Sequence, residues 1–70
     1  MKKRQFLIDA MSKTKISTSE LAEKTNLTQQ FINYVINGKR TPKHENIKKI
    51  CAELGYTYTW FYELDIITQK

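Results

Sequence analysis

The 70-residue sequence lacks several features that define common classes of protein. It has one cysteine, Cys51, which cannot form an internal disulfide and is typical of a protein kept in a reducing compartment. It contains no run of about 20 apolar residues, so we expect no transmembrane segment. The basic start, residues 1–4, is not followed by an apolar stretch long enough for a signal peptide. These absences predict a cytoplasmic protein.

The side-chain sets that most enzymes require are also missing. The sequence offers no Cys–His or Ser–His–Asp arrangement, no paired carboxylates and no glycine-rich phosphate loop, so we expect neither an enzyme nor a cofactor. Cys51 lies within a helical apolar pattern, where a small core residue is expected rather than a nucleophile or a metal ligand. His44 is likewise expected to be a partly exposed structural histidine.

Length and charge narrow the possibilities further. Seventy residues form one domain, and a chain of this size buries only about 60% of its extended surface, so a partner chain would add stability. The net charge of +5 is unevenly placed, because residues 1–43 carry +6 and residues 44–70 carry −1. A basic first half suits a polyanion such as DNA. The alternative is that these charges only confer solubility, and charge alone does not distinguish it from binding to a polyanion.

Apolar spacing and helix caps predict four short helices, at residues 2–13, 18–25, 29–37 and 44–54. Ser17 and Glu20 form a capping box before the second helix, and Thr28 is the expected N-cap of the third. Asn26 stands where a tight turn needs a left-handed residue, and Gly38 and Gly55 follow the third and fourth helices. The expected core positions are Leu7, Ala10, Met11, Leu21, Ala22, Thr28, Ile32, Val35, Ile36, Ile47, Ile50, Cys51 and Leu54.

The C-terminal segment has an ambiguous pattern. Aromatic residues alternate over residues 56–62, which read alone suggests a strand. We favour a short fifth helix over residues 59–64, with residues 65–70 as a short tail. The predicted fold class is therefore all-α, a compact bundle of about five short helices in a single domain, residues 1–70.

Residues 18–37 carry the most informative pattern. Two short helices joined by about four residues are typical of the helix-turn-helix, which sets its second helix in the major groove of DNA. Ala22 supplies the small residue needed where the two helices cross, and Asn26 supplies the permissive turn. Apolar contacts are expected from Leu21, Leu27, Ile32 and Val35. The central helix-turn-helix is predicted from the whole set.

The outer face of the helix at residues 29–37 is unusual for a surface helix because it carries amides and no charge. Amide side chains can pair bidentately with adenine, so this face is suited to reading base edges. The candidate base-reading residues are Gln29, Gln30, Asn33 and Tyr34. The alternative is a merely polar face exposed to solvent. Phe31 lies on the flank, where it either packs on a neighbouring helix or touches a thymine methyl group.

Candidate phosphate contacts surround this face. Basic residues crowd the loop after the helix, and the N-termini of both motif helices offer N–H groups and positive dipole ends. The set comprises Ser17, Thr18, Thr28, Asn37, Lys39, Arg40 and Lys43. Lys2, Lys3 and Arg4 are a further candidate, as a flexible basic arm.

Several segments resemble the Cro/repressor family of phage and bacterial regulators, also called the lambda-repressor-like or XRE family. They are S-T-S-E-L-A at 17–22, T-Q-Q at 28–30, N-G-K at 37–39 with Pro42, and Leu54-Gly55 with Trp60 beyond. The resemblance covers about residues 6–62. It implies a bundle of about five helices that binds operators as a dimer without a cofactor. It also implies that Gln29 and Gln30 read bases while Asn37 and Lys39 hold phosphates.

The sequence departs from this family at informative positions. Many members pair an arginine of the first helix with a glutamate of the recognition helix, whereas the corresponding residues here are Met11 and Ile36. Replacing both charges by apolar groups is often neutral or stabilising, so the fold prediction stands. Asn26 replaces the usual glycine, and His44 stands where the family is often apolar.

The leading hypothesis is a Cro-like repressor that binds a partly palindromic operator in double-stranded DNA as a homodimer. No membrane or small-molecule partner is expected, and 70 residues leave no room for a ligand-binding domain. Such a protein would be cytoplasmic and associated with the nucleoid of a bacterial cell, encoded by the chromosome or by a phage. The dimer candidates are Phe61, Tyr62, Ile66 and Ile67. The alternative is a protein-interaction module, an antirepressor or antitoxin, that uses the same fold.

Overall fold

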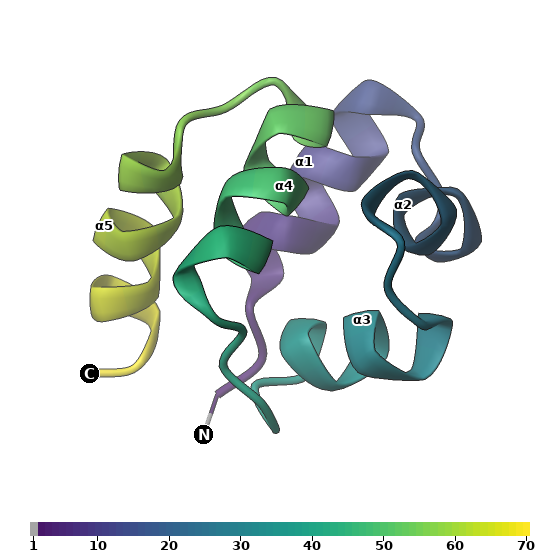
Figure 1. Ribbon diagram of the computed structural model, residues 1–70. Helices are drawn as coiled ribbons and strands as arrows, with labels where there is room; N and C mark the ends of the chain where they lie inside the picture. The colour runs from purple at the N-terminus through teal and green to yellow at the C-terminus, as the bar shows by residue number, and fades with distance from the viewer. Residues whose placement is uncertain (1) are drawn as a thin grey trace.

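A computed structural model describes residues 2–70, and Met1 lies outside the described residues. Five helices follow one another along the chain (Figure 1). Their bounds are α1 Gln5–Thr14, α2 Thr18–Thr25, α3 Gln29–Ile36, α4 His44–Leu54 and α5 Tyr58–Thr68. No strand occurs in the described part of the chain. The all-α prediction is therefore confirmed, and none of the five helices is long and apolar enough to cross a membrane.

The helices are arranged around a central pair. α1 and α4 pack together in the middle, with α5 on one side and α2 with α3 on the other (Figure 1). α2 contacts both α3 and α4, and α1 also contacts α3. α3 is thus supported from behind by two helices, and its opposite side faces outward.

Cap residues fix the helix boundaries largely as the sequence predicts. The Ser17 hydroxyl accepts a hydrogen bond from the Glu20 backbone N–H at 3.1 Å, and the Thr28 hydroxyl accepts one from Phe31 N–H at 3.0 Å. The Glu20 carboxylate, which the predicted capping box places on the Ser17 backbone N–H, instead lies 3.8 Å from the Lys24 ammonium, an i,i+4 pair along α2. Asn26 ends α2 with a φ of 60°, the left-handed conformation expected at this turn.

The core lies where all five helices meet, since each of them contributes buried apolar residues. The predicted core positions are buried, with one exception: Thr28 is exposed, because its hydroxyl caps α3 instead of joining the core stripe. Cys51 is fully buried, as expected of a small core residue. Burial raises the pKa of the Cys51 thiol to about 11, an increase that a hydrogen bond from the Phe61 backbone partly offsets.

The C-terminal segment is a helix rather than a strand, and it is longer than predicted. α5 continues to Thr68, so the prediction of a tail over residues 65–70 is wrong for residues 65–68. Aromatic packing explains the helix, because the Phe6 ring of α1 meets Trp60 and Phe61 edge-on at centroid distances of 5.4 and 5.5 Å. Such long-range contacts outweigh the strand-like alternation of the local sequence.

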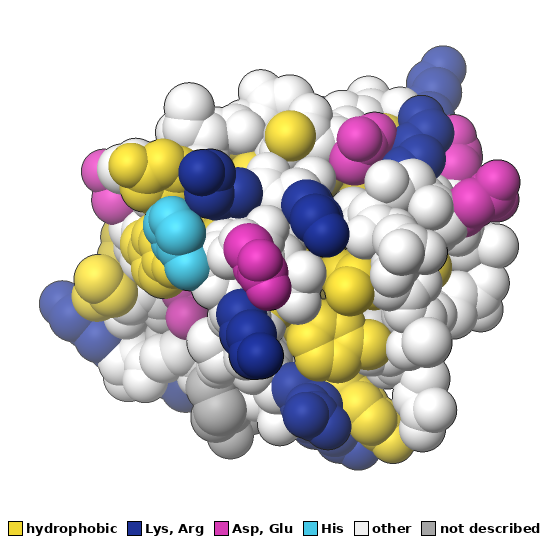
Figure 2. Space-filling model, viewed as in Figure 1, with side chains coloured by type: hydrophobic (Ala, Val, Ile, Leu, Met, Phe, Trp, Pro, Cys, Tyr) yellow, Lys and Arg dark blue, Asp and Glu magenta, His cyan; other side chains and the backbone are white. Residues whose placement is uncertain are grey.

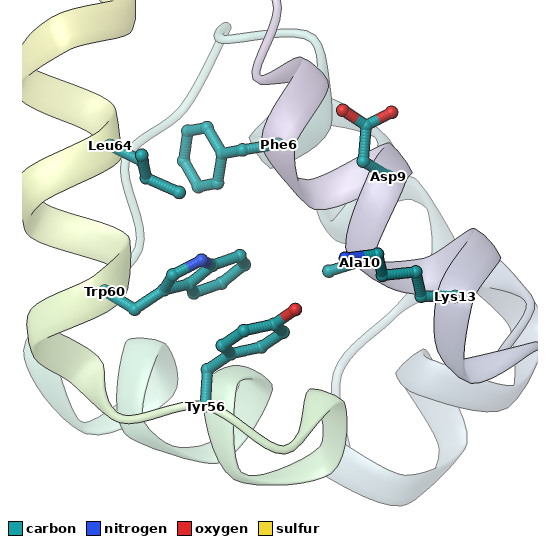
Figure 3. A pocket seen from close by; sticks show the side chains of 7 residues that line it. All are labelled: Phe6, Asp9, Ala10, Lys13, Tyr56, Trp60 and Leu64. Atoms are coloured by element: carbon teal, nitrogen blue, oxygen red, sulfur yellow. The ribbon is translucent and has the colours of Figure 1, made fainter.

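A shallow cleft of about 190 Å³ remains between α1 and α5 (Figure 3). Phe6 and Trp60 line it from opposite sides, and the Tyr56 ring stacks on Trp60 with centroids 4.0 Å apart. None of the residues that line this cleft belongs to α2 or α3.

Candidate nucleic-acid interface

The two helices of the motif are held in a fixed relation by their small and apolar residues. Ala22 is buried where α2 meets α3, and its carbonyl accepts a hydrogen bond from Leu27 N–H at 2.9 Å. Ile32 and Val35 of α3 are buried against the rest of the core. This anchoring of one face leaves the opposite face of α3 open.

The open face carries the side chains that the sequence nominates for base reading. Gln29, Gln30 and Asn33 are exposed, and Tyr34 is half-buried. The Gln30 amide donates a hydrogen bond to the Tyr34 hydroxyl at 2.8 Å, so these two side chains are joined before any ligand arrives. α3 contains no charged residue, which leaves amide and phenol groups as its recognition chemistry.

A shallow hollow of about 270 Å³ adjoins this face. It is lined by Thr28, Gln30, Phe31, Tyr34 and Arg40. The Arg40 guanidinium lies over the Phe31 ring at 5.7 Å from its centroid, and the Lys39 ammonium lies 5.9 Å from the Tyr34 centroid. Phe31 is partly buried and packs against the core, while its ring also lines the hollow beside Arg40.

Basic side chains gather beside the amide face. Lys39, Arg40 and Lys43 are all exposed in the loop between α3 and α4. Figure 2 shows Lys and Arg side chains grouped near this loop, next to largely uncharged surface over α3. The N–H groups of Lys39 and Arg40 both donate to the Tyr34 carbonyl, at 2.8 and 3.3 Å, which ties the basic loop to the end of the helix.

The other candidate phosphate contacts are accessible. Ser17 and Thr28 are exposed N-caps, Thr18 is half-buried in the first turn of α2, and Asn37 is exposed at the C-cap of α3. Each capping hydroxyl already accepts a backbone hydrogen bond, but its own hydrogen is still free to donate to an anion. The Asn37 amide donates to the Asn33 carbonyl at 2.9 Å, which uses one of its two hydrogens.

The N-terminal prediction needs a correction. Arg4, expected in a flexible basic arm, is fully buried and bonded to several parts of the structure. Lys2 is also held, because its backbone N–H donates to the Gln69 side chain at 3.1 Å. Sequence reasoning named Arg4 only as part of a flexible arm and missed its buried position, since a basic run at a terminus gives no signal of burial.

The dimer candidates divide into two groups. Phe61 is 0% exposed and belongs to the core, so the prediction that it contacts a second chain is wrong. Tyr62 is 37% exposed, and Ile66 and Ile67 are each 65% exposed on α5. The Tyr62 hydroxyl lies 2.7 Å from His44 Nδ1, which gives that histidine a structural partner. Within residues 2–70, no three His, Cys, Asp or Glu side chains come together as a metal site needs.

Comparison with known proteins agrees with this geometry. The family model described as Helix-turn-helix matches residues 11–61, which include α2, α3 and α4 and most of the chain. No curated protein and no solved structure gave a match.

Proposed function

Because the chain belongs to the Cro/C1-type helix-turn-helix family of DNA-binding transcription regulators, we propose that it is a Cro-like repressor. In this role it binds a short operator in double-stranded DNA, with α3 in the major groove. The family is not typically enzymatic. A regulator of this kind acts at the nucleoid, where it excludes other proteins from a promoter.

One observation carries the proposal: an uncharged amide face on α3 lies directly beside an exposed basic loop. Gln29 and Gln30 offer paired donors and acceptors, which match the major-groove edge of adenine. Lys39 and Arg40 offer positive charge without base selectivity, which matches phosphate. A sequence-specific DNA-binding protein requires both kinds of group, one to contact bases and one to contact phosphates.

We further propose that the operator-bound form is a homodimer joined through α5. Tyr58, Tyr62 and Ile66 are spaced four residues apart, so they form one stripe along this helix, and all three are exposed. Related by a two-fold axis, such a stripe makes a self-complementary contact, and the matching operator is partly palindromic. The competing candidate, an antirepressor or antitoxin, would use an exposed surface to hold another protein.

The test is selection of preferred sites from random duplexes, followed by affinity and stoichiometry measurements on the selected operator. Gln29→Ala should weaken binding to that operator by about 1–3 kcal/mol, roughly 5- to 150-fold, and relax the sequence preference at one base pair. Lys39→Ala is the matched control, since it should weaken binding to all duplexes equally. It should also reduce the salt slope, the dependence of log affinity on log salt concentration, by about one. A protein that binds no duplex at low ionic strength, yet binds a polypeptide through α3, would refute the proposal.

A further inference from the structure

Arg4 is the one charged side chain among residues 2–70 that is fully buried, at 0% exposure. Its Nε donates to Asp65 Oδ1 at 2.7 Å, which forms an ion pair with α5. Its guanidinium carbon lies 5.4 Å from the centroid of the Phe61 ring. A guanidinium carries five N–H donors, and burial is costly unless most of them are bonded. The remaining donors therefore show which other segments this residue holds.

One guanidinium donor and the backbone N–H of Arg4 bind the end of α3. Arg4 Nη1 donates to the Val35 carbonyl at 2.6 Å, and the Arg4 backbone N–H donates to the Ile36 carbonyl at 2.7 Å. The last carbonyls of a helix have no partner within the helix, and they form the negative end of its dipole. Arg4 thus satisfies the final turn of α3 with both hydrogen bonds and positive charge.

The same guanidinium also holds the basic loop. Nη1 donates to the Arg40 carbonyl at 2.9 Å, and Nη2 donates to the Thr41 hydroxyl at 3.2 Å. Arg40 therefore points its own guanidinium outward, over Phe31, while its backbone is fixed from inside the molecule. Lys39 precedes this fixed point and Lys43 follows it, so the positions of all three exposed cations depend on it.

The far side of the ion pair is fixed by the last turn of α5. The Gln69 amide donates to Asp65 Oδ1 at 3.3 Å and to the Lys2 carbonyl at 3.1 Å. The Lys2 backbone N–H returns a hydrogen bond to the side-chain oxygen Oε1 of Gln69 at 3.1 Å. The two ends of the chain are thus joined beside the residue that holds the loop.

We propose that Arg4 is a positioning residue for DNA-backbone binding, which acts by holding residues 39–43 against the end of α3. The inference rests on the proposed DNA-binding function. Arg4 contacts the C-terminal end of α3 and the loop, not the N-terminal end where Gln29 and Gln30 lie. It therefore sets the part of the affinity that is independent of sequence, although its side chain does not reach the surface.

The decisive variant is the double substitution Arg4→Met/Asp65→Leu. Removing one member of a buried ion pair leaves an unpaired charge and can unfold the domain, whereas replacing both with apolar groups is often neutral. The double variant should remain folded while losing the hydrogen bonds to Val35, Arg40 and Thr41. Ile50→Val, a core change in α4, is the control for a general loss of stability.

Two measurements test the proposal. In the free protein, hydrogen exchange at the amides of Lys39 and Arg40 should become faster in the double variant, while amides of α2 keep their wild-type rates. On DNA, the double variant should bind every duplex about tenfold more weakly and show a salt slope reduced by about one, with unchanged base preference. The control should alter neither the loop exchange nor the salt slope.

The outcomes are separable. Wild-type exchange in the loop of the double variant would show that Arg4 does not position it, and wild-type affinity with an unchanged salt slope would show that the positioning is irrelevant to DNA. Either result overturns the inference, as does an altered base preference. If the wild-type protein binds no duplex at all, the proposed function fails instead, and the exchange experiment still decides whether Arg4 holds the loop.

Discussion

Replacing Tyr34 with phenylalanine removes one hydrogen bond from the recognition surface and leaves the ring in place. In the wild-type structure the Gln30 amide donates to the Tyr34 hydroxyl at 2.8 Å, one turn further along α3. A bidentate contact with adenine needs the amide oxygen and one N–H, and the second N–H is the one that Tyr34 can hold. We therefore propose that Tyr34 orients Gln30 for base reading, in addition to any contact of its own.

The magnitude follows from the exposure of this pair. An intramolecular hydrogen bond contributes about 0.5–1.5 kcal/mol, and an exposed i,i+4 pair contributes only about 0.2–0.5 kcal/mol. We expect Tyr34→Phe to reduce discrimination at the base pair read by Gln30 by about 0.5 kcal/mol, or roughly twofold. The Lys39 ammonium still lies over the ring, so the salt slope should not change.

The base pair to vary is the one at which the Gln30→Ala variant loses its sequence preference. The assay measures binding by fluorescence anisotropy to four duplexes that differ only at this base pair. Adding Tyr34→Phe to Gln30→Ala should have no further effect on discrimination, because the hydroxyl then has no amide to orient. Undiminished discrimination by Tyr34→Phe across all four duplexes would refute this reasoning. So would an equal effect of the substitution in the presence and absence of Gln30.

Two further predictions concern the fold itself. Phe61→Ala should lower the free energy of unfolding by about 3–5 kcal/mol in thermal or urea denaturation, because the ring is fully buried. Tyr62→Ala, on the exposed side of α5, should lower it far less. Equal effects of the two substitutions would contradict the side of α5 that is assigned to the core. The pKa of the Cys51 thiol is raised from 9.0 to about 11 in the folded protein, so the unfolded chain loses the thiol proton first as the pH rises. The free energy of unfolding should therefore fall by about 1.4 kcal/mol per pH unit between pH 9 and pH 11. Urea denaturation of wild type and Cys51→Ala across this range checks the second prediction, and parallel slopes would argue against it.

Local chemistry made the centre of the fold predictable. The hydroxyls of Ser17 and Thr28 cap the helices that follow them, and Asn26 adopts the left-handed conformation between them. Each of these effects acts within four residues of the chain. The bounds of α2 and α4 match the sequence prediction, since α2 begins after the capping Ser17 and α4 ends before Gly55, which has a left-handed φ of 82°.

The end of the chain was less predictable because its structure depends on distant contacts. Tyr58 to Tyr62 alternate as a strand does, and the helical outcome depends on Phe61 and Trp60 packing against Phe6 from α1. A neighbour more than 50 positions away is invisible to a local pattern. The same limit explains the error over Phe61, whose apolar character fits a core and a dimer contact equally well.

Arg4 was unpredictable from the residues around it. Its partners lie at positions 35, 36, 40, 41 and 65, so nothing in the basic N-terminal run indicates that one of its three cations is buried. A terminal charge is usually solvated, and only the converging carbonyls and the Asp65 carboxylate make burial favourable here. The candidate base-reading and phosphate residues, by contrast, were nominated from the sequence, and their functional roles stay predictions.

The departure at Met11 and Ile36 acquires a physical meaning beside this arrangement. Both residues are apolar and 8% exposed, so the ion pair that many relatives of this type place between the first helix and the recognition helix is replaced by packing. Of the two ion pairs within residues 2–70, the buried one joins Arg4 to Asp65 instead.

The end of α3 is still held by an arginine, but this arginine precedes α1 and is paired with the last helix of the chain. The end of α3 is therefore connected through this arginine to a residue of α5, outside the helix-turn-helix. Under the role that we propose for Arg4, the loop that carries Lys39 and Arg40 depends on the ion pair with α5, so contacts that order α5 should also favour the proposed phosphate-binding geometry. We therefore expect dimer formation through the exposed stripe of α5 to strengthen binding to the DNA backbone, and DNA binding to strengthen dimer formation.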